Sequence, residues 1–331
     1  MSIQLGSARR RWVAFLVRAA VSISLIAWIL HQVDWPELVR QVNQLAPSNL
    51  ALAMSSATLL LILQGPVLAW RWSRIADQLR HPLRFSQSTR ITFVGLFFNQ
   101  TLPTSIGGDA IRIWIAHQEG MPFRHAANSV LLERLSGLLT LVLILTSALP
   151  LIWPDIAHLS VRFLFLAALP LALIGIGALW WSAGLRHSKK LNPIIMLAKD
   201  MRCILSSPGL TVELLTLGVL SNLLAIGGMY AFGVTVGMSL TAGQYLGLIP
   251  AVILCTVVPV TIAGWGLREG VMVVLLGSAG VSTEMGLLVS ILFGLALLLA
   301  ALPGGLIWLM EKPRIRSNAT NQAVEPIDSV K

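Results

Sequence analysis

Two short segments of this chain carry residues suited to binding an anion inside a membrane. LPTSIGGDAIR occupies residues 102–112, and VPVTIAGWGLRE occupies residues 258–269. Each has a proline and glycines, followed by an arginine near a carboxylate. Arginine presents a planar fork of donors that fits a phosphate, and a helix N-terminus attracts anions. The chemistry expected of these segments is recognition of a lipid phosphate.

The two segments resemble each other when aligned without a gap. The identical pairs are Pro103 with Pro259, Ile106 with Ile262, Gly108 with Gly264 and Arg112 with Arg268. The conservative pairs are Ser105 with Thr261, Gly107 with Ala263, Ala110 with Gly266 and Ile111 with Leu267. Paired interrupted helices in the two halves of a membrane protein are typical of transporter binding sites. We therefore expect two repeated halves, residues 12–152 and 161–311, inverted relative to each other.

The composition places the chain among polytopic membrane proteins. Of its 331 residues 56% are hydrophobic and 11% charged, with a mean hydropathy of +0.78. A soluble domain carries about 25% charged residues, and a spanning helix needs about 20 apolar ones. The two cysteines and six histidines show no metal or redox spacing. We expect an all-α membrane domain over residues 1–311 without cofactor or metal, and no nucleic-acid partner despite a net charge of +10.

Basic residues predict the orientation. They cluster before the first apolar run, at 71–90, at 183–208 and after residue 311. Cytoplasmic loops carry such an excess of arginine and lysine, so both termini and these loops are expected in the cytoplasm. Arg71 and Arg74 are counted here as loop residues. Residues 312–331 are expected to form a disordered cytoplasmic tail.

This orientation constrains the first polar segment. Residues 91–124 must start and end on the cytoplasmic side, which predicts a re-entrant hairpin that turns at Gly107 and Gly108. The runs 242–263 and 267–281 predict a matching hairpin from the other face. The fold expected is about six full spans plus two re-entrant helical hairpins, with eight full spans as the alternative. The residues assigned to the hairpin turns are Asn99, Pro103, Gly107, Gly108, Pro259, Gly264 and Gly266.

The polar side chains near the turns have two interpretations. Asp109 is expected to be the N-cap of a half-helix that carries Arg112 on the same face. In one interpretation these residues bind a head group, and in the other the Asp109–Arg112 and Arg268–Glu269 pairs only satisfy each other. Glu133 and Arg134 either face the same cavity as Asp109, or Arg134 snorkels to the interface. The candidate head-group residues are Asp109, Arg112, Glu133, Arg134, Arg268 and Glu269.

Four stretches, FNQTLPTSIGGDAIRIW, NSVLLERLSGL, VPVTIAGWGLREG and ALPGG, resemble the lysylphosphatidylglycerol synthase transmembrane-region family, also called the flippase-like domain family. The resemblance runs from about residue 12 to residue 311. The positions that match the family motifs are Asn99, Pro103, Gly107, Gly108, Asp109, Arg112, Glu133, Arg134, Gly264, Gly266, Arg268 and Glu269. The family includes the membrane half of bacterial multiple-peptide-resistance proteins, which carry additional spans and a synthase domain. This chain ends at Lys331, shortly after its last apolar run, so no synthase activity is expected.

The resemblance implies a lipid translocase in a bacterial inner membrane. Its substrate would be a phospholipid or a polyprenyl-phosphate-linked lipid, moved downhill or by ion coupling through Asp109, Glu133 or Glu269. The alternatives are a membrane-embedded glycosyl or aminoacyl transferase that acts on a lipid phosphate with a carboxylate as general base, or a non-catalytic partner of an envelope glycosyltransferase. Expected partners are a membrane lipid, a second copy of the chain or an enzyme of envelope biosynthesis. The chain itself is expected not to be an enzyme.

Overall fold

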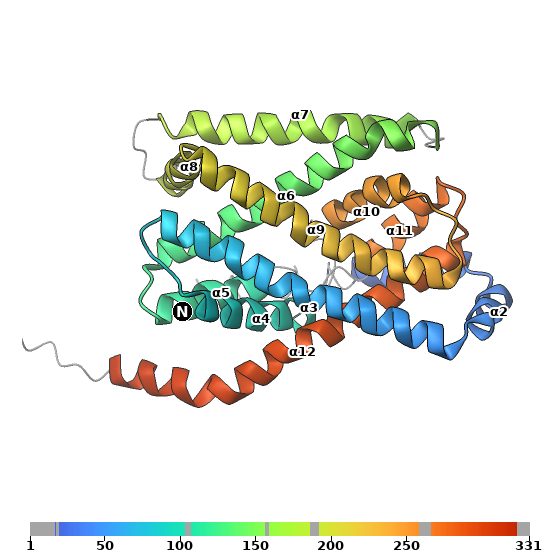
Figure 1. Cartoon of the computed structure of the whole chain (residues 1–331), viewed down its shortest axis with the longest axis horizontal. Helices are drawn as coiled ribbons and strands as arrows, with labels where there is room; N and C mark the ends of the chain where they lie inside the picture. The colour runs from blue at the N-terminus through green and yellow to red at the C-terminus, as the bar shows by residue number, and fades with distance from the viewer. Residues whose placement is uncertain are drawn as a thin grey trace, which may run out of the picture.

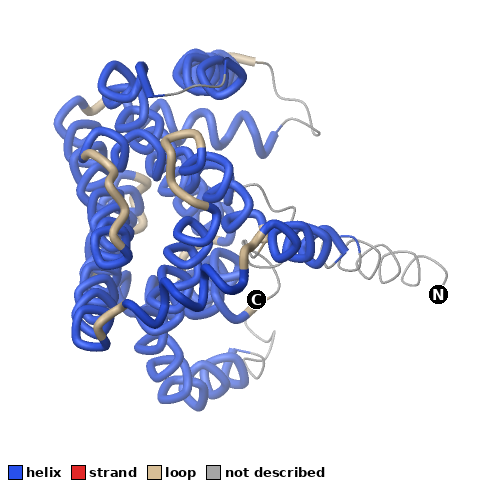
Figure 2. The backbone as a smooth tube through the Cα atoms, turned by 90° about the vertical axis from the view of Figure 1, so that its right-hand side faces the viewer, coloured by secondary structure: helices blue, strands red, loops and turns tan. Residues whose placement is uncertain are grey.

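The computed structural model describes residues 17, 20–102, 107–155, 159–185, 192–257 and 266–322. Every regular element in these ranges is a helix, and Figure 2 shows helices joined by short loops. This confirms the all-α membrane fold predicted from the composition. Pro103, Pro259 and Gly264 lie outside the described residues, so the structure does not describe the tips of the two predicted hairpins.

The helices are numbered as in Figure 1, and a helix at Ala20–Gln32 precedes them. The numbered helices are α2 (Trp35–Gln44), α3 (Pro47–Gln78), α4 (Phe85–Thr101), α5 (Gly107–Gln118), α6 (Phe123–Ile152), the 3-10 turn η1 (Trp153–Asp155), α7 (Leu159–Ser182), α8 (Asn192–Leu205), α9 (Pro208–Val236), α10 (Ala242–Thr256), α11 (Leu267–Gly277) and α12 (Thr283–Gln322).

Five of the described helices are long and apolar enough to cross a membrane. They are found at Pro47–Gln78, Phe123–Ile152, Phe165–Ser182, Pro208–Val236 and Thr283–Met310. These match five of the six full spans predicted from the sequence. The remaining predicted span, at 12–30, is described in part, as the apolar helix Ala20–Gln32.

Two pairs of short helices stand where the sequence predicts re-entrant hairpins. α4 and α5 have 17 and 12 residues, and α10 and α11 have 15 and 11. All four are shorter than the roughly 20 residues that a spanning helix needs. α4 packs against α5, and α10 packs against α11. These lengths and contacts favour two hairpins over the alternative of eight full spans.

The two halves of the chain contain the same elements in the same order. The first has the helix Ala20–Gln32, the short α2, the long α3, the pair α4–α5 and the long α6. The second has α7, the short α8, the long α9, the pair α10–α11 and the long α12. The long helices α3 and α9 run in opposite directions, as do α6 and α12, so α4–α5 and α10–α11 start from opposite ends of the bundle (Figure 1).

Connections rich in basic residues lie at one end of the bundle, and connections poor in basic residues lie at the other. The α3–α4 and α8–α9 connections lie at the left of Figure 1, while α2 and the α9–α10 and α11–α12 connections lie at the right. This is the segregation that the basic residues predict.

In two places the helices run further than expected. α3 continues to Gln78, so Arg71 and Arg74 belong to a helix and not to a loop. α12 continues through residues 312–322, where a disordered tail was expected.

The long helix α12 holds both hairpins in place through glycines. A Cβ on Gly304 would lie 1.9 Å from the backbone oxygen of Phe93 in α4, so the two helices touch along their backbones. A Cβ on Gly294 would lie 2.4 Å from Nη2 of Arg268 in α11. The stretch of α12 from Gly294 to Gly304 is about 15 Å long. The two hairpins therefore meet α12 at different depths.

Gly304→Ala should destabilise the protein, because the added methyl group overlaps the α4 backbone, which has no flexible atom to move. We expect a loss of about 1–3 kcal/mol of stability, the usual cost of overpacking. Gly175→Ala in α7 is the control, since nothing lies within 4 Å of its Cβ. Thermal unfolding in detergent, followed by tryptophan fluorescence, compares the two. Equal midpoints for both variants would contradict the close α4–α12 contact.

Candidate functional site

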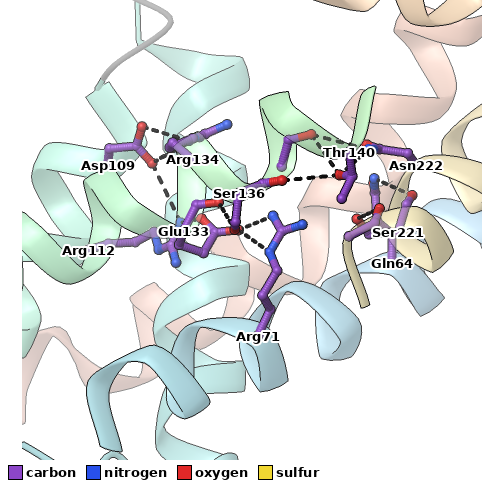
Figure 3. Close-up of polar contacts among 12 residues, drawn as sticks. Gln64, Arg71, Asp109, Arg112, Glu133, Arg134, Ser136, Thr140, Ser221 and Asn222 are labelled. Atoms are coloured by element: carbon purple, nitrogen blue, oxygen red, sulfur yellow. Dashed lines mark hydrogen bonds and ion pairs between the residues drawn. The ribbon is translucent and has the colours of Figure 1, made fainter. Parts of the chain in front are cut away.

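Five charged side chains from three helices meet inside the bundle (Figure 3). Arg71 comes from α3, Asp109 and Arg112 from α5, and Glu133 and Arg134 from α6. We call these five residues the inner charge cluster. A charge at membrane depth costs at least about 2.5 kcal/mol on insertion scales. Five such charges in one place predict a functional role.

Glu133 is the centre of the inner charge cluster. Its Oε1 accepts hydrogen bonds from Nε of Arg71 at 3.2 Å and from Nη2 of the same residue. Its Oε2 accepts a hydrogen bond from Nη1 of Arg112 at 3.1 Å. The side chains of Glu133, Arg71 and Arg112 are 3%, 4% and 5% exposed. One buried carboxylate thus holds two buried arginines from different helices.

Asp109 forms the outer part of the same cluster. It accepts hydrogen bonds from Nε and Nη2 of Arg134, both at 2.9 Å, which is the two-pronged geometry that arginine and carboxylate favour. Its distance to Nη1 of Arg112 is 3.6 Å. The side chain of Arg134 is 47% exposed, unlike those of the other members. Three arginines and two carboxylates leave the cluster with one excess positive charge.

Three donors of the buried arginines have no partner in the described part of the chain. They are Nη1 of Arg71 and Nε and Nη2 of Arg112. An unsatisfied buried donor costs about 1–3 kcal/mol, more when it belongs to a charged group. Trp72 lies 4.5 Å from the guanidinium of Arg112 and offers its ring face, which a cation favours but which leaves these N–H groups unpaired. Buried donors without a partner are rare in proteins, so these three are candidates for binding a ligand.

Glycines allow the arginines to reach these positions. A Cβ on Gly137 of α6 would lie 2.9 Å from Nη2 of Arg71, and one on Gly218 of α9 would lie 3.1 Å from its Nη1. In the first hairpin, a Cβ on Gly95 would lie 2.6 Å from Cγ of Arg112. A larger residue at any of these sites would contact an arginine side chain closely and require it to shift.

The start of α5 is capped by the neighbouring helix. The backbone N–H of Gly108 donates to Oδ1 of Asn99 in α4 at 2.9 Å, so Asn99 bonds the interrupted backbone. α5 already begins at Gly107, which places Asp109 within its first turn. The N-cap role expected of Asp109 is therefore wrong: its carboxylate turns to Arg134 instead.

A second, smaller group lies at the start of α11. Nε and Nη2 of Arg268 donate to Oε1 of Glu269 at 3.1 and 2.6 Å, and Nε also donates to the hydroxyl of Ser290 in α12. Oε2 of Glu269 accepts the N–H of Gly266 at 2.6 Å. Gly266 has φ +85°, which favours glycine. The carboxylate of Glu269 thus occupies the N-terminal position where an anion was expected.

The structure joins some of the predicted site residues and separates others. Asp109, Arg112, Glu133 and Arg134 come together, so the interpretation that Glu133 and Arg134 face Asp109 is the one the geometry supports. Arg112 pairs chiefly with Glu133 and not with Asp109. Arg268 and Glu269 pair with each other, as one alternative proposed, and are bound to α12.

Arg71 was missed by the sequence reasoning. It follows the apolar run 49–69 by two positions and stands among many basic residues, which is typical of a cytoplasmic loop. Its place within α3 depends on Glu133, which is 62 residues away. A weak signal was available, because a helix that continued past residue 69 would place Arg71 on the same face as Leu68 and Ile75, two apolar residues.

A polar seam continues from the inner charge cluster toward the centre of the bundle. Nδ2 of Asn222 in α9 donates to Oγ1 of Thr140 in α6 at 3.0 Å, and Nε2 of Gln64 in α3 donates to the carbonyl of Ser221 at 2.9 Å (Figure 3).

Within the described residues, no group of three or more histidine, cysteine, aspartate or glutamate side chains is placed to hold a metal.

In the described part of the chain the regular elements are all helices, five of them apolar and long enough to span a membrane, and a charge cluster lies among them. These features define a polytopic membrane protein with an internal polar site. The family model for the lysylphosphatidylglycerol synthase TM region matches residues 15–305. The chain therefore belongs to this family. No curated protein matches the chain. Membership supports a membrane-embedded role related to lipids.

Asn99→Ala should weaken the first hairpin, because the N–H of Gly108 loses its acceptor. Loss of an N-terminal cap costs about 1 kcal/mol. Gln100→Ala is the matched control, since the structure gives the neighbouring Gln100 no hydrogen bond among the described residues. We expect a lower unfolding midpoint for Asn99→Ala than for Gln100→Ala in detergent. The reverse order would show that the cap does not hold α5.

Proposed function

We propose that this protein translocates a lipid that carries an anionic phosphate between the leaflets of a membrane. The observation that carries the proposal is the set of unpaired donors on Arg71 and Arg112, buried in a cluster with excess positive charge. A phosphate is the acceptor that an arginine fork fits best. Family membership supports a lipid as the molecule that bears it.

A lipid can approach the inner charge cluster from the side. Arg134 is half-exposed, and Leu131 and Leu135 on the same face of α6 are 47% and 41% exposed. Residues three and four apart share one face of a helix. This face offers a cation for the head group beside an apolar surface for the acyl chains. Arg134 would thus be the first contact and Arg112 the inner one.

The two arginine sites fit successive positions along the path of a head group. Arg112 lies against α4 and α6, while Arg268 lies against α12 at another depth. In this proposal the hairpins α4–α5 and α10–α11 each present one arginine, and the head group passes from one to the other. The polar seam of Thr140 and Asn222 supplies hydrogen-bond partners near the first site.

The geometry gives less support to a transferase that acts on a lipid phosphate. Such an enzyme needs a carboxylate free to accept a proton from the acceptor substrate. Glu133 and Asp109 both accept arginine hydrogen bonds, and Glu269 is engaged by Arg268 and by the N–H of Gly266. We therefore propose a non-enzymatic translocase.

The charge pattern fits a protein of a bacterial inner membrane with both termini in the cytoplasm. The proposal also includes a partner, which is either a second copy of the chain or an enzyme of envelope biosynthesis.

Arg112→Gln and Arg268→Gln should each reduce lipid exchange at least about tenfold, since each loses one charge-assisted contact worth about 1.5–3 kcal/mol. Purified protein is reconstituted in vesicles of phosphatidylcholine with a fluorescent phosphatidylglycerol. The fraction of probe accessible to an external quencher is followed over time. Mass spectrometry of the same lipids reports any chemical conversion.

Arg74→Gln is the matched control. Arg74 also lies in a membrane helix and pairs with a carboxylate, Glu213, but its side chain is 40% exposed and outside the inner charge cluster. We expect wild-type exchange from this variant. Unchanged exchange in the Arg112 and Arg268 variants would overturn the role of the arginines. A changed lipid mass would favour the transferase, and neither exchange nor conversion in the wild type would favour a non-catalytic partner.

A further inference from the structure

We propose that Arg71 and Arg112 together form a phosphate site that Glu133 fills in this conformation, and that the lipid phosphate binds by displacing Glu133. This inference rests on the proposed function and deepens it. It assigns a ligand role to Arg71 and makes Glu133 a competitor of the ligand.

Glu133 holds the arginines as a phosphate would. Its Oε1 is bonded to Arg71 and its Oε2 to Arg112, so the two oxygens bridge two cations from different helices. A phosphate diester has two charged oxygens on one atom and can bridge the same pair. The carboxylate is the acidic side chain already in the place that such a ligand would occupy.

A phosphate would satisfy the cluster better than Glu133 does. The carboxylate leaves Nη1 of Arg71 and Nε and Nη2 of Arg112 unpaired in the described part of the molecule. The two charged oxygens of a phosphate diester have about three lone pairs each, whereas a carboxylate offers about four lone-pair sites in total, so the diester can accept more hydrogen bonds from the two forks. Gly137 and Gly218 are the neighbours of the Arg71 guanidinium, so no side chain of α6 or α9 at those positions blocks its free edge.

The charges of the cluster also fit one monoanion. Arg71, Arg112 and Arg134 carry three positive charges, and Asp109 and Glu133 carry two negative ones. A bound phosphate diester brings the sum to zero without protonation of either carboxylate. Asp109 keeps Arg134 as its partner throughout, because the hydrogen bonds between them do not involve Glu133.

Competition by Glu133 has a use in transport. A site must bind its substrate well enough to admit it and weakly enough to release it, as in conducting pores. When the lipid leaves, Glu133 returns to the arginines and prevents two buried cations from remaining without a counterion. The carboxylate thus lowers the affinity of the site and favours release.

The test measures binding separately from exchange. Wild-type protein and variants are placed in nanodiscs of phosphatidylcholine, and dihexanoyl phosphatidylglycerol is titrated in by calorimetry. Glu133→Gln keeps the shape of the side chain and removes the competing charge. We expect it to bind the probe about tenfold tighter or more, because the phosphate no longer competes with charge-assisted hydrogen bonds to the carboxylate. Glu213→Gln, which makes the same change beside Arg74 outside the cluster, should bind as the wild type does.

A second variant covers the case in which Glu133→Gln fails to insert. Arg71→Gln leaves Glu133 paired with Arg112, so no carboxylate is orphaned. We expect about tenfold weaker binding, since one of the two forks is lost. Wild-type affinity in Arg71→Gln, affinity in Glu133→Gln equal to or below that of the wild type, or an equal gain in Glu213→Gln would each overturn the inference.

Lipid exchange measured on the same preparations separates this inference from the proposed function. If the wild type exchanges lipid but the variants do not show the expected order of affinities, only the proposed competition by Glu133 is refuted. If the variants show the expected order of affinities but the wild type does not exchange lipid, the proposed translocation is refuted and the proposed phosphate site is retained.

Discussion

The structure depends on the bridge that Glu133 makes between Arg71 and Arg112. Breaking a buried ion pair on one side costs about 3–5 kcal/mol, because the remaining charge is left uncompensated. The three side chains come from α6, α3 and α5, so the bridge ties the first hairpin to two long helices. A hairpin that does not span the membrane needs such an anchor. The same bridge holds together the two arginines from which we propose a phosphate site.

Backbone proximity supports this bridge. Gly95 and Gly108 allow α4 and α5 to approach so closely that a Cβ on Gly108 would lie 2.0 Å from the carbonyl oxygen of Gly95. Asn99 then reaches the amide of Gly108 and caps α5. Gly304 brings α12 against α4 in the same way, and Gly294 gives Arg268 its place against α12. Small residues at helix contacts are the usual means of close packing in membranes, where the hydrophobic effect between helices is weak. Here they also set where the charges lie.

The sequence predicted those features that depend on local pattern. The apolar runs predicted the long helices, and the positions of the basic residues predicted which loops share an end of the bundle. The break after residue 101 and the similarity of the segment at 258–269 predicted the hairpins. The pairing of side chains depends on contacts between helices, and a single sequence does not contain them. For this reason Arg71 was assigned to a loop, Asp109 was assigned the cap that Asn99 provides, and Arg112 was matched with Asp109 although Glu133 lies closer.

We propose above that a lipid phosphate binds between Arg71 and Arg112. The most direct test is an experimental structure of the protein in nanodiscs that contain phosphatidylglycerol, at a resolution that shows head groups. We expect a phosphate within hydrogen-bond distance of Arg112 and Arg71, with the carboxylate of Glu133 turned away from both. A lipid-loaded protein in which Glu133 still bridges the two arginines, and in which every ordered phosphate lies outside the inner charge cluster, would contradict the account.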